Sequence, residues 1–577
     1  DGARGPGGGG GGGGPPPGRP GAPGGLAPPR PAVVDINPYN PSETAAAASA
    51  PELSEVDAAI RLGEIEERIL TSLITNPSLL KEDAISDVDG MAPTPQYRAM
   101  DWIARLDPLR LDPNDPYLLQ RYALATLWFS TYERALRHDA KGGALAGGSM
   151  GGPWPNWDQR AGWLSGRGYC AWHGVSCHHR AGTSPSEVRY DDNGGITHLN
   201  LTTNDLRGTI PPEIFRTLGD VRLLDLSDNG LTGSIPTELG DLSELESLYL
   251  WGNLLDDCIP PSVGRCTKLR NVYLHDNLLD GPLPSGLGGL RQLNNVGFHK
   301  NYLTGTIPPE WGTIRDSNDV SNWKDVRTLY LDTNMLSGTL PPRLFASLEG
   351  AVDVRFSENS FSGPVPRTAG NMAECKYLYL NGNVLNGALP SELGRLSHLS
   401  EFHLGSNYFT GTLPSSWGNG LNDLAQLYLE NNRLVGSIPS EWGRMYDLRR
   451  LFLGYNNIEG TLPPEMAKME ELHDLRMQHN KIGGAIPSEL GNMFNLEMLY
   501  LEDNELRGTI PPELGGLVHL RYLTLYGNDG LEGDMPREVC DLVSGDGLVD
   551  LVAGKCNEDE EEEEGEAALT CGCCTNC

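Results

Sequence analysis

The stretch from Leu199 to Ile214, LNLTTNDLRGTIPPEI, contains a short pattern that returns along most of the chain. It reappears as LDLSDNGLTGSIPTELG at 224–240, as LYLDTNMLSGTLPPRL at 329–344 and finally as LTLYGNDG at 523–530. Each copy holds one Asn, and successive copies of this Asn lie 24 or 25 residues apart, with a single step of 33. A period of this length is the sequence signature of a solenoid. The fourteen residues are Asn204, Asn229, Asn253, Asn277, Asn301, Asn334, Asn359, Asn383, Asn407, Asn432, Asn456, Asn480, Asn504 and Asn528.

The pattern has a physical cause. Apolar residues stand five and three positions before each Asn, as Leu248 and Leu250 stand before Asn253. Two apolar positions separated by one variable residue indicate a short strand with one buried face. The Asn amide carries two donors and an acceptor, which can satisfy backbone groups of its own turn and of the neighbouring coil. Because one coil cannot bury its own apolar face, the coils must stack around a continuous core. We therefore predict an α/β repeat solenoid.

Composition excludes several classes of protein. The chain of 577 residues has a formal net charge of −33, and it has no basic stripe of the kind that nucleic-acid binding requires. No window approaches 18 consecutive apolar residues, so no transmembrane helix is expected. No signal peptide is visible, and the chain begins at Asp1 without Met. That start is expected of a fragment or a processed form, and it leaves open an upstream signal or anchor.

Eight of the eleven cysteines lie at the two ends of the repeats, where the terminal coils need covers. We predict disulfide-stapled caps in an oxidising compartment, and the six C-terminal cysteines allow 15 pairings. A zinc site in CGCCTNC at 571–577 is the less favoured alternative, and no metal or cofactor is expected. Cys266 and Cys375 replace Leu in the repeat and are expected to be buried thiols, with a Cys258–Cys266 bridge as an alternative. The cap cysteines are Cys170, Cys177, Cys540, Cys556, Cys571, Cys573, Cys574 and Cys577.

Five segments are expected along the chain. The first is rich in Gly, Pro and Ala, which predicts disorder. In the second, Leu62, Ile65, Ile69 and Leu73 share one face of a loosely docked helix. The predicted segments are a disordered stretch at 1–52, a helical linker at 53–93, an N-terminal cap at 94–195, repeats at 196–535, and a Cys-rich C-terminal cap with the acidic loop EDEEEEEGE at 536–577.

A family resemblance becomes specific at the first cap. Cys170-Ala-Trp172-His-Gly174-Val175-Ser-Cys177 resembles the C-x-W-x-G-V-x-C signature of plant-type leucine-rich-repeat caps. The repeats, of the form NxLxGxIPxELGxLxxLxxLxL, resemble those of plant receptor ectodomains and polygalacturonase-inhibitor-like proteins. The resemblance covers roughly 115–535. It implies an extracellular leucine-rich-repeat superhelix of about 14 repeats, with a parallel β-sheet on the concave face and Cys-rich caps. The chain departs from the receptors in having no kinase domain, no visible membrane span and an unusual CGCCTNC end.

The variable strand residues are predicted to form a recognition surface. Residues six, four and two before each Asn point away from the core, and stacking about 4.8 Å apart turns each position into a column. Tyr dominates the column at minus four; the alternative explanation is that Tyr is simply a good strand former. The sixteen predicted ligand-binding residues are Tyr249, Trp251, Tyr273, His275, His299, Tyr330, Asp332, Arg355, Tyr377, Tyr379, His403, Tyr428, Glu430, Arg476, Tyr500 and Glu502.

These patterns favour binding over catalysis. His275 and His299 are neighbours in one column, but no catalytic motif accompanies them, so they are expected to contact a ligand. We predict a non-enzymatic recognition module, receptor-like or secreted, that binds a protein, peptide or glycan at the cell surface or outside the cell. The alternative is an extracellular structural or adhesive protein, or an inhibitor of a wall-acting hydrolase. The ligand and the oligomeric state do not follow from the sequence.

Two local features complete the prediction. Asn200-Leu-Thr202 is the single N-x-S/T sequon, so Asn200 is a predicted glycosylation site. The 33-residue step between Asn301 and Asn334 carries about nine extra residues within TIRDSNDVSNWKD. Because the repeat pattern of strand and Asn resumes unchanged after these residues, we expect a surface loop there, with a functional protrusion as the alternative.

Overall fold

The computed structural model describes residues 55–73, 94–115, 117–131, 157–161, 163–164, 169–177, 195–312, 322–544, 549–553 and 569–575. All of them belong to Ala50–Cys577, one of the two units into which the chain divides. The predicted disorder at 1–52, the acidic loop and most of the nine-residue insertion lie outside the described residues. No described helix is both long and apolar enough to cross a bilayer.

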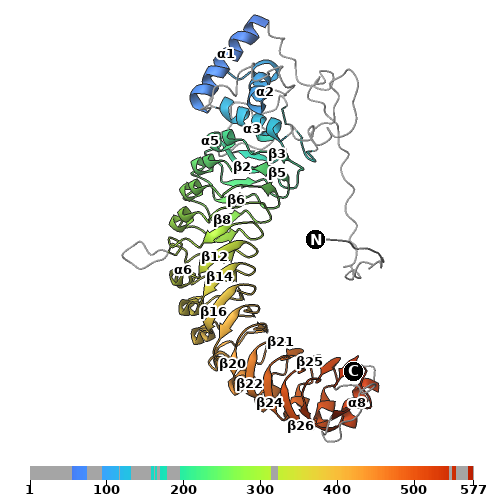
Figure 1. Cartoon of the computed structure of the whole chain (residues 1–577). Helices are drawn as coiled ribbons and strands as arrows, with labels where there is room; N and C mark the ends of the chain where they lie inside the picture. The colour runs from blue at the N-terminus through green and yellow to red at the C-terminus, as the bar shows by residue number, and fades with distance from the viewer. Residues whose placement is uncertain are drawn as a thin grey trace, which may run out of the picture. The chain divides into compact units, whose positions relative to one another are not determined.

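One sheet of 16 strands runs through the described repeats, with the strands in sequence order (Figure 1). The first pair, β1 and β2, is antiparallel, and every later neighbour is parallel and in register. The sheet confirms the predicted leucine-rich-repeat solenoid. Its strands are β1 (Val175–Cys177), β2 (Ile196–Asn200), β4 (Leu223–Asp225), β6 (Ser247–Tyr249), β8 (Asn271–Tyr273), β9 (Asn295–Gly297), β11 (Thr328–Tyr330), β13 (Asp353–Arg355), β15 (Tyr377–Tyr379), β17 (Glu401–His403), β19 (Gln426–Tyr428), β21 (Arg450–Phe452), β23 (Asp474–Arg476), β25 (Met498–Tyr500), β27 (Tyr522–Thr524) and β30 (Asp550–Val552).

Further strands, most of them directly after an Asn turn, form smaller parallel sheets beside the main one. They are β3 (Arg207–Gly208), β5 (Gly230–Gly233), β7 (Leu254–Leu255), β10 (Thr304–Thr306), β12 (Met335–Thr339), β14 (Ser360–Gly363), β16 (Val384–Ala388), β18 (Tyr408–Thr410), β20 (Val435–Gly436), β22 (Asn457–Thr461), β24 (Lys481–Gly484), β26 (Glu505–Gly508), β28 (Gly530–Leu531), β29 (Gly533–Asp534) and β31 (Leu569–Thr570).

Most coils close with a short helix that begins just after a Pro, because Pro fixes φ and needs no N–H partner there. The helices are α1 (Glu55–Ser72), α2 (Pro95–Asp101), η3 (Trp102–Leu106), α3 (Leu118–Ser130), η4 (Tyr169–Ala171), α5 (Pro212–Thr217), η6 (Thr237–Asp241), η7 (Pro261–Arg265), η8 (Ser285–Gly289), α6 (Pro342–Ser347), η9 (Arg367–Asn371), η10 (Ser391–Arg395), α7 (Trp417–Gly420), η11 (Ser440–Arg444), η12 (Pro464–Lys468), η13 (Ser488–Asn492), η14 (Pro512–Gly516) and α8 (Arg537–Ser544).

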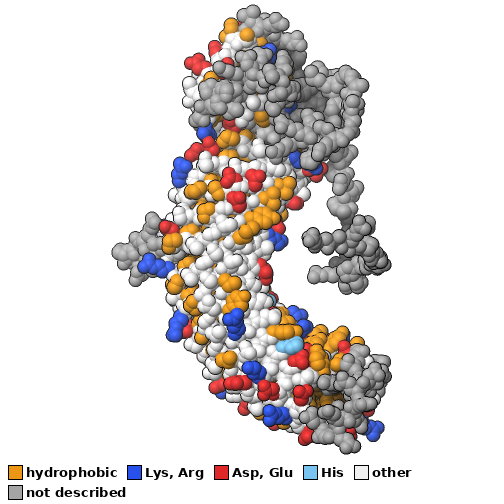
Figure 2. Space-filling view, in the orientation of Figure 1, with side chains coloured by type: hydrophobic (Ala, Val, Ile, Leu, Met, Phe, Trp, Pro, Cys, Tyr) orange, Lys and Arg blue, Asp and Glu red, His pale blue; other side chains and the backbone are white. Residues whose placement is uncertain are grey.

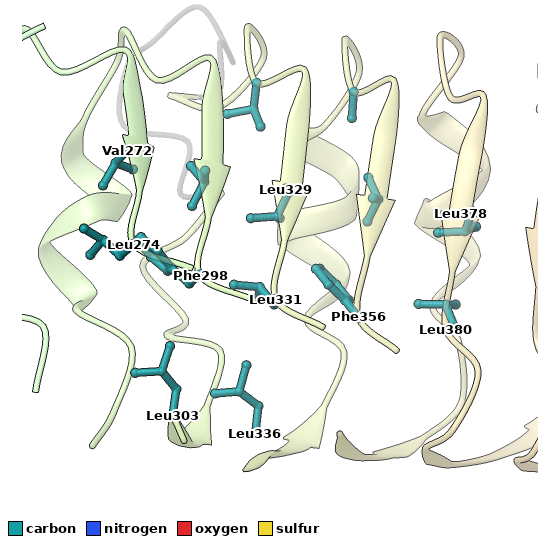
Figure 3. Packing of buried hydrophobic residues seen from close by; sticks show 14 of the residues in the cluster. Val272, Leu274, Phe298, Leu303, Leu329, Leu331, Leu336, Phe356, Leu378 and Leu380 are labelled. Atoms are coloured by element: carbon teal, nitrogen blue, oxygen red, sulfur yellow. The ribbon is translucent and has the colours of Figure 1, made fainter. Parts of the chain in front are cut away.

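The core is a set of apolar layers that continue from coil to coil. Leu329 and Leu331 of one coil, Phe356 of the next and Leu378 and Leu380 of the one after it lie in the same inward rows (Figure 3), and all five are fully buried. Burying a Leu side chain contributes about 2 kcal/mol relative to leaving it exposed. Because each coil buries its apolar residues against the next one, the core depends on stacking.

The repeated Asn residues form a hydrogen-bonded ladder along the edge of the main sheet. The Asn407 amide donates to the carbonyl oxygens of Leu404 (3.2 Å), Gly405 (3.2 Å) and, in the preceding coil, Leu380 (3.0 Å). Its Oδ1 accepts from the backbone N–H of Leu385, also in the preceding coil, at 3.0 Å. The same set recurs at other positions, for example at Asn253 and Asn504. The Asn therefore satisfies backbone groups of two coils at once.

A compact aromatic cap covers the first coil. Rings of Trp128, Trp157, Trp163 and Trp172 follow one another with centroids 4.7 to 5.9 Å apart. Fully buried Arg121 donates to both oxygens of Asp107 at 2.7 Å. Its guanidinium also lies over the rings of Trp102 and Trp172. The charge pair is thus desolvated but well paired, which is the condition under which a buried ion pair is tolerated.

The helix α3 of this cap begins at Leu118, and just before it Asp115 accepts the N–H of Tyr117 at 2.8 Å. The helix α1 was expected to dock loosely, but Ile65, Ile69 and Leu73 are buried. The Arg216 side chain also donates to the carbonyl of Leu73, so the first coil holds the end of this segment.

Both sets of cap cysteines form disulfides. The bonds are Cys170–Cys177, Cys540–Cys573 and Cys571–Cys574, while Cys556 and Cys577 lie outside the described residues. The pairing of four C-terminal cysteines leaves them unavailable as zinc thiolates. Cys258, Cys266 and Cys375 are free thiols, so the alternative Cys258–Cys266 bridge is not formed. Burial raises the pKa of both Cys266 and Cys375 to about 12.

The irregular step keeps the core intact. Trp311 and Trp323, on either side of residues 313–321, are fully buried with their ring centroids 4.7 Å apart. The Trp311 indole donates to the carbonyl of Pro284, and the Trp323 indole donates to that of Leu287. The two Trp side chains therefore take the places of the two buried Leu residues that follow the Pro in other coils, such as Leu239 and Leu242. The choice between surface loop and functional protrusion stays a prediction.

Replacing Asn407 by Ala should lower the free energy of unfolding by about 3 kcal/mol, because it leaves buried carbonyl and N–H groups of two coils without partners. Urea denaturation followed by circular dichroism measures the effect. The control is Asn457→Ala at an exposed strand position, which should change stability by less than about 0.5 kcal/mol. Equal effects of the two substitutions would contradict the role of the ladder.

Candidate recognition face

The main sheet has one face turned away from the core, here called the open face. It consists of the side chains six, four and two residues before each ladder Asn. Most of the predicted ligand-binding side chains are half-buried on it, because neighbours from adjacent coils pack against both sides of each. Glu502 differs from the prediction in being buried, with 7% of its surface exposed. Its carboxylate accepts a hydrogen bond from the Thr524 hydroxyl of the next coil.

Planar side chains form a continuous stack along the minus-four column of this face. The Arg355 guanidinium lies 5.0 Å from the ring centroid of Tyr330 and 4.7 Å from that of Tyr379. The ring of His403 follows, 4.3 Å from Tyr379 and 4.2 Å from Tyr428. Stacked aromatic pairs contribute about 1 kcal/mol each beyond the area that they bury. The stack therefore rigidifies the open face as well as shaping it.

The stack continues toward the C-terminal coils. Phe452 meets Tyr428 edge to face with centroids 4.7 Å apart. The Arg476 guanidinium then lies between Phe452 (4.4 Å) and Tyr500 (5.1 Å). Arginine thus occupies the same place between two rings at Arg355 and at Arg476.

In the N-terminal coils the stack changes column at Gly297. This residue has no side chain, and a Cβ there would lie 2.5 Å from the ring of Tyr273. The rings of Trp251, His275 and His299 in the minus-two column stack instead, with centroids 5.4 and 4.2 Å apart. His299 then meets Tyr330 edge to face at 5.6 Å. The contact between His299 and Tyr330 therefore connects predicted residues of the minus-two column with those of the minus-four column.

Both stacked arginines are neutralised by their own strands. Arg355 donates to the two oxygens of Asp353 at 2.8 and 2.7 Å, and Arg476 donates to those of Asp474 at 2.9 and 2.8 Å. This hydrogen bonding raises the pKa of each arginine. Both arginines belong to the predicted ligand-binding set, and in the structure the charge of each is paired with an Asp of its own strand. The repeated Asp-x-Arg spacing in β13 and β23 was the sequence signal for this pairing.

Carboxylates outnumber cations on the open face. Once Asp353 and Asp474 are paired with Arg355 and Arg476, five carboxylates are left against one guanidinium, Arg450. The carboxylates of the open face are Asp225, Asp332, Asp353, Glu401, Glu430, Asp474 and Glu502.

Several polar atoms of the open face have no hydrogen-bond partner among the described residues. Eleven buried side-chain nitrogen or oxygen atoms of the described chain are in this state, and five of them belong to the open face. A buried polar group without a partner costs about 1–3 kcal/mol, so such a concentration is unusual for a purely structural surface. The five atoms are His299 Nδ1, Asp332 Oδ1, His403 Nε2, Glu430 Oε2 and Gln478 Oε1.

Burial shifts the titration of these same groups. It raises the pKa of Asp332 to about 6 and raises that of Glu430, because the charged carboxylate loses water. It lowers the pKa of both His299 and His403 to about 4. The two histidines are therefore neutral at pH 7 and add no positive charge to the face.

One group of side chains could hold a metal ion. Ligand atoms of His275, Asp276 and His299 lie within 4.8 Å of one another. However, the two imidazole rings are nearly parallel, with 15° between their planes, so their in-plane nitrogen lone pairs do not converge. Asp276 is also paired with Lys300 at 3.2 Å. This geometry favours a stacked pair over a preformed metal centre.

An exposed apolar stripe lies beside the open face and was not predicted from the sequence. It occupies the position directly after the ladder Asn, which is polar at Ser360 within the stripe and again from Arg433 through Asn457 to Lys481. Figure 2 shows hydrophobic side chains gathered along the middle of the repeats. The signal was present in the sequence as apolar residues at one repeat position in six of seven successive coils. The stripe contains Leu254, Leu278, Tyr302, Met335, Val384 and Tyr408, which are 40 to 53% exposed.

The remaining site prediction concerns Asn200. Its side chain is at the exposed end of β2, where Oδ1 accepts the N–H of Thr202 at 3.2 Å. Glycosylation at this residue stays a prediction.

Family models agree with this architecture. A leucine-rich-repeat model matches residues 195–255 and 424–482, and a second one matches 495–517. No curated protein gives a significant match.

Solved structures give further matches. A plant peptide hormone receptor, RGFR1, solved in complex with RGF2, is 30% identical, with a TM-score of 0.51 over 60% of this chain and 57% of that one. The chain thus spans little more than half of that receptor structure. The Arabidopsis receptor kinase HAESA, solved with the peptide hormone IDA and the co-receptor SERK1, is 24% identical over 67% of this chain and 77% of that one, with a TM-score of 0.45. The Leptospira interrogans leucine-rich-repeat protein LIC12759 is 27% identical, with a TM-score of 0.47; the match covers 62% of this chain and 83% of that one. The repeats are thus leucine-rich repeats, and they are similar to those of a plant receptor ectodomain.

Acid should destabilise the fold through His403. Its pKa is about 4 in the folded chain and 6.5 ordinarily, so the unfolded chain binds more protons between these values. Stability is then complete above pH 6.5 and falls as the pH decreases toward 4. Replacing His403 by Gln should make the decrease in Tm between pH 7 and pH 4.5 smaller than in the unmodified chain. The control is His519→Gln at an exposed site, which should leave the decrease unchanged; the same result at both sites would refute the assignment.

Proposed function

We propose that the chain is a non-enzymatic recognition module that binds a protein or peptide ligand through its open face, at the cell surface or outside the cell. The observation that carries the proposal is the stack of planar side chains together with the five unpartnered polar atoms beside it. Large aromatic groups supply contact area, and unpartnered polar atoms gain hydrogen bonds when a ligand binds. Unpartnered buried polar atoms lower stability, so a purely structural role does not explain them.

The rigidity of the stack supports a binding role. Tyr379, His403 and Tyr428 hold one another in place, so few rotamers remain to be fixed when a ligand binds. Side-chain ordering otherwise costs about 0.5–1.5 kcal/mol per residue at an interface. In this proposal Arg355 and Arg476 hold the rings between which they lie, and the Tyr, Trp, His and acidic residues of the predicted set contact the ligand.

The comparisons and the caps support the same function. The similar RGFR1 structure is that of a peptide hormone receptor bound to RGF2. Three disulfides at the ends of the repeats fit an oxidising compartment, as expected of a secreted or cell-surface protein. We propose the five segments expected from the sequence as the domain organisation, with both caps closing one repeat domain.

A triple substitution tests the proposed face. A display library of random twelve-residue peptides would be selected on the full chain, and the affinity of the enriched peptides measured by biolayer interferometry. Replacing Tyr273, Tyr330 and Tyr379 by Ala should weaken their binding about thirtyfold or more, since even one hot-spot aromatic residue among the three contributes about 2 kcal/mol.

The matched control replaces three tyrosines outside the open face, Tyr302, Tyr408 and Tyr446, which are 44 to 58% exposed. It should leave affinity within about twofold, and circular dichroism should show both variants folded. Enriched peptides that bind the open-face variant as tightly as the unmodified chain would show that the ligand contacts another surface.

A further inference from the structure

A second surface of the repeats differs from the rest of the chain in carrying no charge. It is the outer side of the five-stranded sheet formed by β10, β12, β14, β16 and β18, and it is here called the neutral face. It consists of the residues one, three and five positions after the ladder residues Asn301, Asn334, Asn359, Asn383 and Asn407. All fifteen residues are exposed or half-buried, because they alternate with positions that face the core.

The absence of charge is unusual for this chain. Charged residues make up 21% of the sequence, so about three would be expected among fifteen positions, and none is found. Charge returns at both borders, with Asp280 in the preceding coil and Arg433 in the following one. Figure 2 shows few charged side chains over the middle repeats. Since the whole chain has a formal net charge of −33, the neutral face is a local exception.

Hydroxyl groups form a connected row on the neutral face. Thr306 pairs with Ser337 on the next strand, and Ser337 pairs with Ser360 on the strand after it. Neighbouring strands lie about 4.8 Å apart, so the three hydroxyls follow one another across the sheet. The Thr306 methyl lies against Gly338, where a Cβ would come within 2.6 Å of it. This contact leaves Thr306 little freedom, so its hydroxyl is held in place.

Apolar side chains lie on both sides of this row. The exposed apolar stripe crosses the neutral face, with Tyr302 and Met335 in the coils before Ser360 and with Val384 and Tyr408 in the coils after it. The two tyrosines are 49% and 44% exposed. Hydroxyl groups and apolar groups are therefore presented side by side on one sheet face.

This combination matches the chemistry of an uncharged sugar polymer. Each sugar hydroxyl both donates and accepts hydrogen bonds, as each Ser or Thr hydroxyl does. The C–H faces of sugar rings are apolar and can pack against aromatic rings and aliphatic side chains. An anionic polymer would find no cation on this face and would be repelled by the net charge of the chain.

A protein partner fits the neutral face less well. Stable protein interfaces use about 20–30 residues on each side, whereas this face has fifteen. A second copy of the chain would also bring two strongly acidic molecules together. A peptide that adds a strand needs a free sheet edge, but the neutral face presents side chains instead.

We propose that the neutral face binds a neutral polysaccharide that lies across strands β10 to β18. The tyrosines and the apolar side chains pack against sugar rings, and the Ser and Thr hydroxyls exchange hydrogen bonds with sugar hydroxyls. Each single contact is open to water and therefore weak, so a polymer that repeats the same contacts binds more tightly than a short oligosaccharide. This site is separate from the open face and does not depend on peptide binding there.

Adsorption to insoluble neutral polysaccharides tests the proposal. The full chain is mixed with microcrystalline cellulose, chitin, β-1,3-glucan or β-mannan in about 0.15 M salt, which screens surface charge, and the unbound protein is measured. The chain should adsorb to at least one of these polymers and should not be retained by a gel of polygalacturonate. Replacing Tyr302 and Tyr408 by Ala should weaken adsorption about tenfold, since two aromatic contacts are lost. The control is Tyr446→Ala, which changes a 58% exposed tyrosine elsewhere and should leave adsorption within about twofold.

A steric variant gives an independent test. Ser360→Lys places a long side chain across the hydroxyl row, and the fold accepts Lys at this repeat position, as Lys481 shows. It should weaken adsorption about tenfold. Glu505→Lys makes a larger change of charge at the same repeat position outside the neutral face, and it should leave adsorption within about twofold. Circular dichroism should show both variants folded.

The outcomes separate the neutral face from the open face. The variant without Tyr302 and Tyr408 should keep its affinity for enriched peptides, and the open-face triple variant should keep its adsorption to the polysaccharide. Adsorption to none of the four polymers overturns the proposal, as does equal adsorption by the Ser360→Lys and Glu505→Lys variants or stronger retention by polygalacturonate. A dimer in analytical ultracentrifugation that Ser360→Lys dissociates would assign the face to a second copy and overturn it as well.

Discussion

Everything in the repeat domain depends on the hydrogen bonds of the ladder Asn. One amide satisfies carbonyls in its own turn and in the preceding coil, and its oxygen holds an N–H of that coil. An apolar side chain cannot form these hydrogen bonds. A Gln side chain has the same amide group, but its additional methylene would place that group differently at the turn. The ladder thereby fixes the register between coils, and the register decides which side chains share a column.

The open face can vary because the ladder and the core use other residues. On this face, side chains of adjacent coils contact one another in two different ways. Where a guanidinium or imidazole lies between rings, as at Arg355 and His403, the face is stiffened from within. Where glycine alternates with Glu430 and Gln478, acceptors stay without partners. The first relation stabilises the chain, and the second supports the proposed binding role.

The sequence was sufficient for the frame and the columns. A strand period of 2 and a coil period near 24 are enough to place Tyr379 beside His403, and His403 beside Tyr428. The sequence was insufficient for the site. The change of column at Gly297 and the unpartnered oxygens depend on rotamers of neighbouring coils, which a repeat pattern does not encode. The pairing of Arg355 with Asp353 lies within one strand and left a signal only in the Asp-x-Arg spacing. The pairing of the C-terminal cap cysteines could not be predicted from the sequence either, because their spacing is compatible with many pairings.

The placement of the thiols has a consequence for how the chain matures. Each described disulfide joins residues close in sequence, at separations of 7, 33 and 3. Cys170 and Cys177 can therefore be oxidised as soon as the first cap emerges, before Cys266 and Cys375 are synthesised. Those two are then enclosed by the stacking coils, with their thiolates suppressed by burial. When the C-terminal cysteines finally appear, only the half-exposed Cys258 of these internal thiols is still within reach of exchange. Because the chain is synthesised from its N-terminus onward, this order protects its eleven cysteines, an odd number, from incorrect disulfide pairing.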